Sequence, residues 1–572
     1  MIQNNSHSNA HELITIEPIQ GDATARVLEV IQQAGDNSVI HFSGDCYHFW
    51  PDRAYEAYYY ISNNQHGLKN IAFPLVKKRN FTIDGGGARF VFHGEIVPFV
   101  VDGSENVTLR NFSVDWERPF FSQGEVQEAH VDRVIVKIDC DAYPYRVENR
   151  RMIFEGEGWE SPLTEGVFAF SPKTRAPGYR SGDSMGLGYP EFIEVESLGE
   201  GRIKLCEEFP ILPELGDVVV FRHYRRRTPA VFLVESKELL LESITLHQAG
   251  GMGFIAQFCE NVELRLCTVT PSEGRIFSVC ADASHFVNCR GLIQLIDCHF
   301  ENQLDDPLNV HGLNTRIKEV IDEYTVLVER VHHEQHGVSV GLAGDAVQFA
   351  HNTTLLSYGD NVITSVESIN ARYARISFER LLPKGLYPGH VVENMSWTPD
   401  LLVSGCTVRG NRARGLLIST PGKVRIEGNN ISAGGSGIKI SGDANFWFES
   451  GAVRDVCIRD NDFGECCYGS PSWGHSVIDI DPEIAEPEKN KACFHQNIRI
   501  ENNRFATSDK GILFARSVDG LIFTGNTIQP SGFYPEWRML QAITLEACQS
   551  VRVEENIGLE VSQELDQASE TI

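Results

Sequence analysis

The segment Lys423-Val-Arg-Ile-Glu-Gly-Asn-Asn430 is one copy of a pattern that recurs along most of the chain. Each copy starts with a small or polar residue, alternates apolar with variable positions, and then reaches Gly, Asn or Cys. Strand-like alternation at a period near 23 residues is typical of coils that stack on a shared core. The sequence therefore predicts an all-β fold, a right-handed parallel β-helix. Clear copies begin at Asn80, Asn106, Asn261, Lys423, Asp455, Asn497 and Ser550, and weaker ones at Glu238, Leu292, Asp400 and Gly520.

An Asn-Asn or Asn-Asp step follows several of the predicted strands. Asn429-Asn430, Asn461-Asp462 and Asn502-Asn503 are the clearest examples. Because Asn tolerates the left-handed backbone conformation, we expect these residues at the tight bends between faces of the coil.

Two gaps between copies are too long for one coil. They separate Asn106 from Glu238, 132 residues later, and Leu292 from Asp400, 108 residues later. Both gaps contain short alternating runs and end in similar text, with Gly-Asp-Val-Val-Val-Phe in one and Gly-Asp-Ala-Val-Gln-Phe in the other. We interpret them as two related antiparallel β-barrel-like domains inserted into turns of the solenoid, the second forming a wall of any nearby cleft.

The open end of a solenoid needs a cover, and residues 22–33 fit an N-terminal capping helix. Val27, Leu28 and Ile31 share one face, and Asp22 or Thr24 could cap its start. The predicted organisation is residues 1–117 for the cap and first coils, 118–228 for barrel 1, 229–312 for the central coils, 313–398 for barrel 2, 399–562 for the last coils and 563–572 for a tail.

The chain has 572 residues and a net charge of −28, which argues against nucleic acid or an anionic membrane as partner. Its first residues show no basic-then-apolar signal, and no apolar run approaches membrane length. We expect a cytoplasmic protein, or a periplasmic or secreted one if a signal peptide has been removed. Protruding inserts favour association into a homo-oligomer.

The fourteen cysteines do not form a zinc pattern, because no second Cys-x-x-Cys pair accompanies a first. Several fall at or beside apolar repeat positions and are expected to be buried free thiols. His332-His333-Glu-Gln-His336 resembles a metal cluster but lies inside an insert without a recognised ligand frame. No metal and no cofactor is expected. The repeat cysteines are Cys259, Cys267, Cys280, Cys289 and Cys298.

Three acids mark the candidate catalytic site. Asp282 closes an apolar strand, and Asp305-Asp306 follow 23 residues after it, at the matching place one coil later. Coil stacking should gather the three carboxyl groups, and adjacent like charges resist ionising together, so one acid keeps its proton while another stays a base. Glycoside hydrolysis requires such a pair, one carboxylic acid that donates a proton and one carboxylate that acts as a base. Few basic residues lie nearby in sequence, Arg275 and Arg316 among them.

Further residues could bind sugar. Polar side chains could contact hydroxyl groups, although each could equally serve as a turn or ladder residue. Two tryptophans could offer a platform to the apolar face of a sugar, or pack where a loop meets the helix. The polar candidates are Gln303, Asn309, His311 and Arg414, and the aromatic ones are Trp116 and Trp473.

An aspartate followed one coil later by an Asp-Asp pair resembles the arrangement of acids in polygalacturonases. The chain as a whole is more similar to the α-1,3-galactosidases of glycoside hydrolase family 110. The resemblance covers the cap, the repeats, both inserts and the segments around Asp282 and Gln303–Gly312. It implies removal of terminal α-1,3-linked galactose from blood-group-B-type or linear glycans, with inversion and without metal. It also implies that Asp305 is the general acid and that Asp282 with Asp306 holds and deprotonates the water.

An inverting mechanism sets expectations for the geometry. Acid and base should lie about 6.5–9.5 Å apart to admit a water molecule. The Asp306 charge should raise the pKa of Asp305. Arg316-Ile-Lys318 matches a triplet with which polygalacturonases contact uronate, but it lies at the mouth of an insert, so we interpret it as a coincidence that disfavours galacturonate.

Two other functions remain open on the sequence. One is a different inverting β-helix glycosidase that acts on a galactose-containing polysaccharide, for which an open groove would be expected. The other is a non-catalytic glycan-binding solenoid, for which Asp305 would be dispensable. A polysaccharide lyase would need a basic proton acceptor, and this patch is acidic. The sequence does not choose between Asp282 and Asp306 as the principal base.

Overall fold

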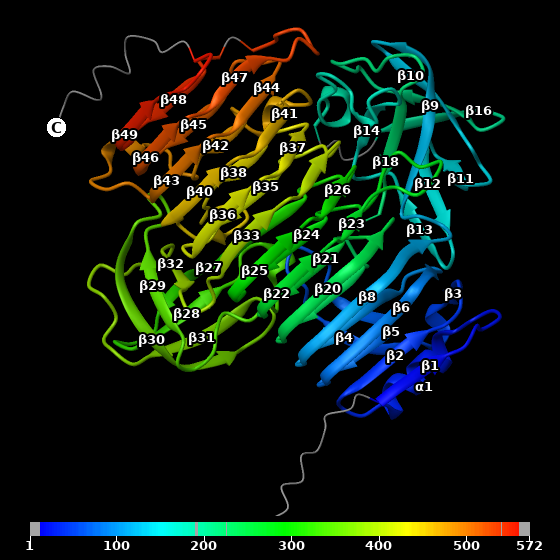
Figure 1. Cartoon of the computed structure of the whole chain (residues 1–572), viewed down its shortest axis with the longest axis horizontal. Coiled ribbons are helices and arrows are strands. Elements are labelled where there is room, and N and C mark those ends of the chain that lie inside the picture. Colours follow the sequence, from blue (N-terminus) through cyan, green and yellow to red (C-terminus); the bar gives the residue numbers. More distant parts are fainter. Residues whose placement is uncertain (1–11, 189–192, 225, 539, 560–572) are drawn as a thin grey trace, which may run out of the picture.

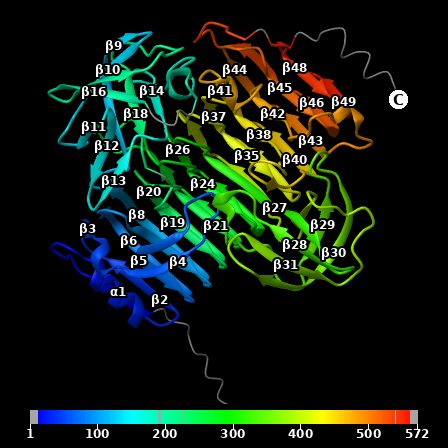
Figure 2. The ribbon, with the colours of Figure 1, turned by 180° about the vertical axis from the view of Figure 1, so that it is seen from behind.

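The computed structural model describes residues 12–188, 193–224, 226–538 and 540–559. Within them the chain forms a parallel β-helix that carries two antiparallel inserts, as Figure 1 shows, so the predicted fold class is confirmed. The inserts project from different sides of the solenoid in both Figure 1 and Figure 2. The predicted tail, residues 563–572, lies outside the described residues.

Three parallel ladders make the faces of the solenoid. The first contains β1 (Glu12–Ile16), β2 (Ser38–Phe42), β6 (Arg79–Phe92), β8 (Glu105–Trp116), β20 (Lys237–Leu246), β22 (Glu260–Arg265), β25 (Arg290–Ile296), β33 (Asp400–Ser404), β36 (Lys423–Glu427), β40 (Asp455–Arg459), β43 (His495–Glu501), β46 (Val518–Thr524) and β49 (Gln549–Glu554). The second contains β3 (Cys46–Phe49), the later parts of β6, β8 and β20, β23 (Thr268–Val269), β26 (His299–Glu301), β34 (Thr407–Arg409), β37 (Asn430–Ala433), β41 (Asp462–Cys466), β44 (Arg504–Thr507) and β47 (Thr527–Pro530).

The third ladder carries the site described below. It contains β5 (Gly67–Val76), β7 (Val97–Asp102), β19 (Val231–Val234), β21 (Phe254–Gln257), β24 (Ser284–Val287), β27 (Leu308–Val320), β35 (Leu416–Ser419), β38 (Ile438–Ile440), β42 (Ile478–Ile480), β45 (Leu513–Arg516) and β48 (Ile543–Glu546). Two short strands pair antiparallel at its margins, β4 (Tyr55–Tyr59) with β5 and β39 (Glu449–Ser450) with β27.

The core consists of like residues stacked in register. Val424 on β36 pairs with Val456 on β40, which pairs with Ile498 on β43. Alternate positions of each strand enter this core because side chains of a strand point to opposite faces in turn. The repeated apolar pattern of the sequence is thus the pattern of one continuous interior.

A polar column lines one bend of the coil. The column consists of five stacked residues, Asn429, Asn461, Asn503, Asn526 and Asn556. From Asn461 onward, each side-chain oxygen accepts hydrogen bonds from the backbone N–H and the side-chain N–H of the asparagine before it. Buried thiols of Cys267, Cys298 and Cys406 precede this column in the earlier coils.

The expected role of the asparagines in left-handed backbone holds only in part. Asn502 has a φ of 56°, but Asn429 and Asn461 follow a left-handed residue, Gly428 or Asp460, and work through their amide side chains. The five repeat cysteines predicted as buried free thiols are buried and unpaired.

The first insert is antiparallel. Its main sheet has the order β15-β14-β18-β9-β10-β17-β16, beside a small sheet β11-β12-β13. The strands are β9 (Phe121–His130), β10 (Arg133–Ile138), β11 (Tyr145–Glu148), β12 (Arg151–Gly156), β13 (Trp159–Pro162), β14 (Val167–Ser171), β15 (Ala176–Pro177), β16 (Glu194–Gly199), β17 (Arg202–Cys206) and β18 (Val218–Arg222).

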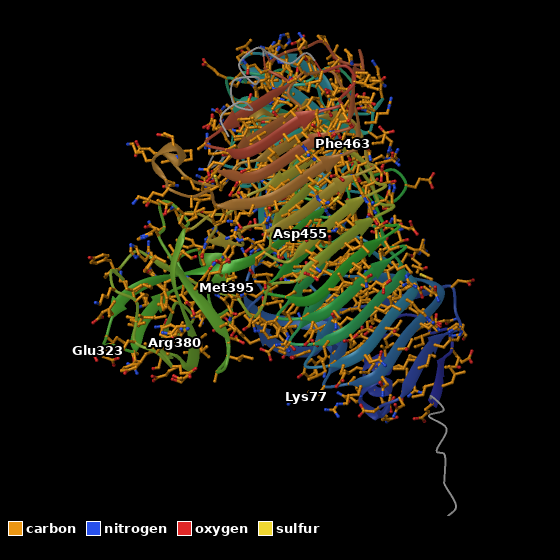
Figure 3. All side chains as sticks on the ribbon, turned by 60° about the vertical axis from the view of Figure 1, so that its left-hand side comes forward. Lys77, Glu323, Arg380, Met395, Asp455 and Phe463 are labelled. Carbon is orange, nitrogen blue, oxygen red and sulfur yellow. The ribbon has the colours of Figure 1, made fainter. Side chains whose placement is uncertain are left out.

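The second insert closes into a barrel, in which β27 pairs with β28 and, around the ring through β31, β30 and β29, with β32. Figure 3 shows it standing beside the coils with Glu323 and Arg380 at its far end. Its own strands are β28 (Thr325–Glu329), β29 (Ala346–Ala350), β30 (Ser357–Ser368), β31 (Tyr373–Phe378) and β32 (Val391–Asn394).

The capping helix α1 (Thr24–Gln33) buries Val27, Val30 and Ile31 against the first coil. Neither predicted cap residue occupies the N-cap position, which is Ala23, although Asp22 Oδ1 accepts from the Thr24 backbone N–H at 2.9 Å. No helix among the described residues is long and apolar enough to cross a membrane. The 3₁₀ turns are η1 (Pro51–Arg53), η2 (Asp183–Gly186), η3 (His333–Gln335), η4 (Pro471–Trp473) and η5 (Pro487–Lys489).

The asparagine column predicts that substitutions within it lower the free energy of unfolding more than substitutions beside it. Replacing Asn429 with Ala would remove the hydrogen bonds that its buried side chain makes with the Cys406 N–H and the Val403 carbonyl, so we expect the free energy of unfolding to fall by about 2–4 kcal/mol. Asn430→Ala is the matched control, because this neighbouring side chain is exposed, and its cost should stay within about 0.5 kcal/mol. Urea titration measures both, and equal costs would contradict the role of the column.

Candidate active site

A cavity of about 390 Å³ opens over the third ladder. Its floor includes Asn309, Leu417 and Lys439, which occupy one register row of β27, β35 and β38. The lining also includes Asp443, Trp447 and Glu449 from the segment after β38, and Trp473 and His475 around η4. No lining residue comes from 313–398, so the expectation that the second insert forms the wall is wrong. The segment before β39, which pairs with β27, takes that place.

The strand register brings the three predicted acids together. Ser284, Leu308 and Leu416 are paired across β24, β27 and β35, so Asp282, Asp306 and Arg414 fall in one column two residues earlier. Asp305 precedes this column by one residue. One oxygen of each of the three carboxyl groups lies within 4.8 Å of one oxygen of each of the others.

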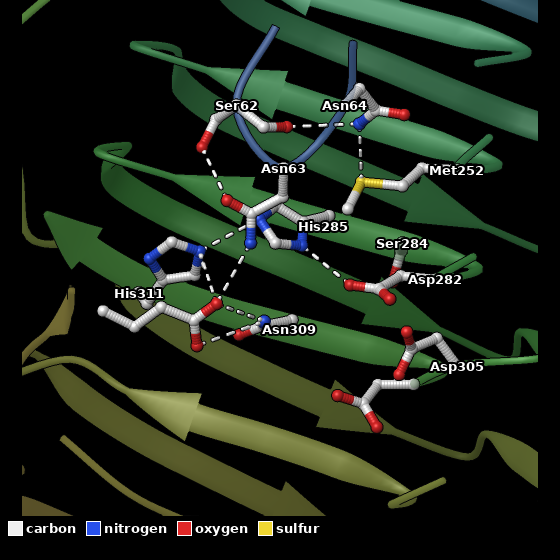
Figure 4. Close-up of polar contacts among 12 residues, drawn as sticks. Ser62, Asn63, Asn64, Met252, Asp282, Ser284, His285, Asp305, Asn309 and His311 are labelled. Atoms are coloured by element: carbon white, nitrogen blue, oxygen red, sulfur yellow. Dashed lines mark hydrogen bonds and ion pairs between the residues drawn. The ribbon is translucent and has the colours of Figure 1, made fainter. Parts of the chain in front are cut away.

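Each acid has a different partner. Asp282 Oδ2 lies 2.7 Å from His285 Nδ1, as Figure 4 shows. Asp305 Oδ2 accepts from the Arg226 guanidinium at 2.7 Å. Asp306 accepts from the Arg414 guanidinium at 2.6 Å and from the Arg414 backbone N–H at 3.0 Å.

These surroundings separate the pKa values of the acids. Burial, reinforced by the Asp305 charge, raises the pKa of Asp282. Burial also raises the pKa of Asp306, although Arg414 opposes it. Burial acts on Asp305 in the same direction, but the charges of Arg226, Arg412, Arg414 and Arg222 outweigh it and lower the pKa of Asp305. The expectation of a raised pKa for Asp305 is therefore wrong, because arginines distant in sequence converge on it.

The acids are also closer than expected. Carboxylate oxygens within 4.8 Å of one another fall short of the separation of about 6.5–9.5 Å expected for an acid and a base on either side of a sugar. The register explains this, since the acids occupy adjacent rungs of one ladder and not opposite walls of the cavity.

The predicted sugar contacts divide into two groups. Asn309, Arg414 and Trp473 line the cavity, whereas Gln303 and His311 do not. Gln303 is fully buried, and His311 is buried against His285. Trp116 is also buried, with its indole N–H donating to Gly94 O and its ring beside Phe92, so it cannot offer a face to a sugar.

Trp473 is held in place by Asp183, which the sequence did not reveal, and by two arginines. Its indole N–H donates to Asp183 Oδ2 at 3.0 Å, and Asp183 belongs to the first insert. The guanidinium carbons of Arg412 and Arg414 lie 4.4 and 4.9 Å from the ring centroid. A rigid aromatic ring beside Asp306 and its Arg414 partner is suited to the apolar face of a sugar.

Other sequence candidates are occupied elsewhere. Arg316 and Lys318 both approach Glu329 inside the second barrel, at 2.8 and 3.8 Å, so the uronate-like triplet does not reach the cavity. His332 stacks near Trp447. Among the described residues, Asp282, Asp305 and Asp306 are the one group of acids, histidines or cysteines with metal-like spacing, and two of them are already paired with arginine.

Comparison with known proteins agrees with this architecture. The family descriptions that match are GLAA-B beta-barrel domain I at residues 122–219, GLAA-B beta-barrel domain II at 325–392 and right handed beta helix region at 390–563. In fold, the A-module of Azotobacter vinelandii mannuronan C-5 epimerase AlgE6 is similar, with a TM-score of 0.41, 9% identity and coverage of 97% and 93% of the two chains.

The protein is a β-helical glycoside hydrolase. It is 37% identical over 553 residues to α-1,3-galactosidase B of Bacteroides thetaiotaomicron, covering 94% of this chain and 89% of the relative. It is 36% identical over 547 residues to α-1,3-galactosidase A of Shewanella woodyi, covering 94% and 88%. The chain therefore belongs to the α-1,3-galactosidase family.

Arg226 provides a test of the electrostatics. Its removal in Arg226→Met takes a positive charge away from Asp305 and Asp282, so their pKa values rise and the bell-shaped pH profile of kcat/KM should move to higher pH by about 1–2 units. Arg227→Met is the control, because Arg227 is half-exposed and pairs with Glu95 instead. An unmoved profile in Arg226→Met would contradict the assigned ion pair.

Proposed function

We propose that the protein removes terminal α-1,3-linked galactose from glycans, of the blood group B type or linear, by exo-acting hydrolysis with inversion. The acid trio in the cavity over the third ladder carries the proposal, because it provides proton donors and acceptors within reach of one another in a chain whose relatives bear this activity in their names. The cavity volume of about 390 Å³ and its bounding segments at 443–449 and 471–475 support action on a chain end.

The proposed reaction uses the three acids as one unit. Asp305 donates a proton to the glycosidic oxygen as the bond to the anomeric carbon breaks, and a water molecule attacks that carbon and gives its proton to Asp282 or Asp306. A water molecule that makes hydrogen bonds of about 2.7 Å can bridge two carboxylate oxygens up to about 5 Å apart. The 4.8 Å limit within the trio meets this condition, so two acids can hold the attacking water together.

The proton for Asp305 comes from its neighbours. Without sugar, Arg226 keeps Asp305 ionised, while the raised pKa values place protons on the Asp282 and Asp306 side of the trio. Coupled acids titrate as a unit, so a proton can pass to Asp305 when the glycosidic oxygen arrives. Burial of the trio strengthens these charge effects because water is excluded.

Leaving groups of different acidity test the general acid. Asp305→Asn should lower kcat/KM for an α-1,3-linked galactosyl disaccharide by about 10³–10⁴-fold, because its sugar leaving group needs the proton. The loss should be smaller with nitrophenyl α-galactoside, whose leaving group is acidic. Retained folding and galactose binding serve as controls, although thermal stability should fall because Arg226 loses its charged partner. Rates like those of the wild type on the disaccharide would remove Asp305 from this role.

Inversion has a direct readout. Proton NMR during the first turnovers of nitrophenyl α-galactoside should show β-galactose before mutarotation produces the α-anomer, since water attacks from the face opposite the leaving group. If the α-anomer forms first, the enzyme retains configuration and one of the acids is a nucleophile. Release of internal fragments from a galactose-containing polysaccharide would instead support the endo-acting alternative.

A further inference from the structure

A buried chain of hydrogen bonds leads away from Asp282. His285 lies on β24 and His311 on β27, and Figure 4 shows the two rings in line with Asp282. Asp282 Oδ2 is 2.7 Å from His285 Nδ1, and His285 Nε2 is 2.9 Å from His311 Nε2. Beyond them Glu449 Oε1 lies 3.6 Å from His311 Nε2. Both imidazole rings are 1% exposed or less.

The contacts of this chain fix its number of protons. His311 Nδ1 faces the carbonyl oxygen of Gly312 at 2.7 Å, and a carbonyl can only accept, so this nitrogen carries a proton. The nitrogen–nitrogen contact and the carboxyl–nitrogen contact each need one proton as well. The three hydrogen bonds therefore hold three protons. An ionised Asp282 with two neutral imidazoles would supply only two, so the chain holds one proton more.

That additional proton can reside at any of three places. It can reside on Asp282, which then donates to a neutral His285. It can reside on His285, beside an ionised Asp282, or on His311, with His285 donating to Asp282 through Nδ1. Each arrangement satisfies the same three contacts, and hops along the two shared hydrogen bonds interconvert them. The chain therefore has the form of a proton wire that ends beside the Glu449 carboxylate.

We propose, resting on the proposed hydrolysis, that Asp282, His285 and His311 form a proton relay that switches Asp282 between acid and base within each turnover. When the water attacks, the Asp282 proton moves to His285 Nδ1 and the His285 Nε2 proton moves to His311 Nε2. Asp282 is then a carboxylate and accepts the proton of the water. After the product leaves, the relay proton returns from His311 to Asp282, and the proton taken from the water passes from Asp282 to Asp306, which had given its own proton to Asp305. The number of protons on each group is then restored.

The surroundings favour both end states. Burial raises the pKa of Asp282, lowers the pKa of His285 to about 4 and lowers the pKa of His311, which places the extra proton on Asp282 at rest. Burial opposes ionisation of Glu449, but the charge of Arg414 and any positive charge on the neighbouring imidazoles outweigh burial and lower its pKa, so Glu449 stabilises a proton drawn to His311. The charged groups facing the rings are Asp282 and Asp305 from turns, Arg226 after β18, Glu334 of η3 and Glu449 of β39.

Glu449 is itself held in place. The Asn63 side chain donates to Glu449 Oε1 at 3.1 Å, and Asn309 donates to both oxygens at 3.4 and 3.5 Å. Asn63 in turn accepts from Ser62, and its backbone oxygen accepts from Arg226, the partner of Asp305. The far end of the relay, Glu449, and the ion pair of the trio are thus joined through the loop that carries Ser62 and Asn63.

Two substitutions interrupt proton transfer while keeping hydrogen bonds. In His285→Asn the amide can still bond Asp282, and in His311→Gln it can still bond His285, but neither amide can accept one proton and release another as an imidazole does. We expect kcat on a galactosyl disaccharide to fall about 10–100-fold with KM within about threefold, as general acid–base assistance is lost. The pH profile should shift, and the dependence of kcat on the deuterium fraction of the solvent should change from curved to linear.

His495→Asn is the matched control. His495 is equally buried but lies on β43, in the first ladder, and does not line the cavity. Its replacement should leave the pH profile and the solvent isotope dependence unchanged even if thermal stability falls. If the His285 and His311 variants behave like this control, the rings are structural and the relay is refuted.

Neutron crystallography tests the relay without any turnover, so its failure and that of the proposed function are distinguishable. A deuterated crystal without sugar should show a deuteron on His311 Nδ1 and one in each of the two remaining contacts. Two deuterons in place of three would overturn the proton count even if the protein is an active galactosidase. Three deuterons together with no galactosidase activity would preserve the wire and refute only the substrate.

Discussion

The register of the third ladder is the constraint on which the site depends. Parallel pairing of β24, β27 and β35 fixes which residues share a column, and the column two residues before the strands holds Asp282, Asp306 and Arg414. Strands in such a ladder are about 4.8 Å apart, so charges placed on successive rungs cannot separate. A one-residue slip in any of these strands would turn the floor of the cavity inward and the core outward.

Gathering buried acids would be costly without compensation. Removing one partner of a buried ion pair leaves an uncompensated charge, at a cost of about 3–5 kcal/mol. Here Arg226 and Arg414 each neutralise one acid, and His285 accommodates the third through a shared proton. The unequal partners give the three carboxyl groups unequal proton affinities, which identical acids in identical surroundings would lack.

The sequence predicts the parts of this structure that are local or periodic. Alternating apolar residues reveal each strand, and the 23-residue spacing places Asp282 near Asp305 because a coil has nearly constant length. Arg226 and Glu449 could not be found this way, since they lie 79 and 140 residues from Asp305 and Asn309 and arrive from segments with no repeat. The predicted pKa of Asp305 was wrong for the same reason, because the arginines that lower it are distant in sequence.

The prediction for Trp116 was wrong for another reason. Trp116 continues the alternation of β8 and pairs in register with the core residue Phe92.

Strand β27 links the coils, the second barrel and the proton relay in one stretch of chain. Its first residues complete the third ladder and carry Asn309 and His311 on the side away from the core. At Gly312 and Leu313 it pairs with β39, which carries Glu449, and from Asn314 onward it pairs with barrel strands. A Cβ at Gly312 would lie 2.6 Å from the Ser450 hydroxyl, so glycine permits this close approach. The barrel strands therefore pair with the same strand, β27, that holds Glu449 of β39 near His311.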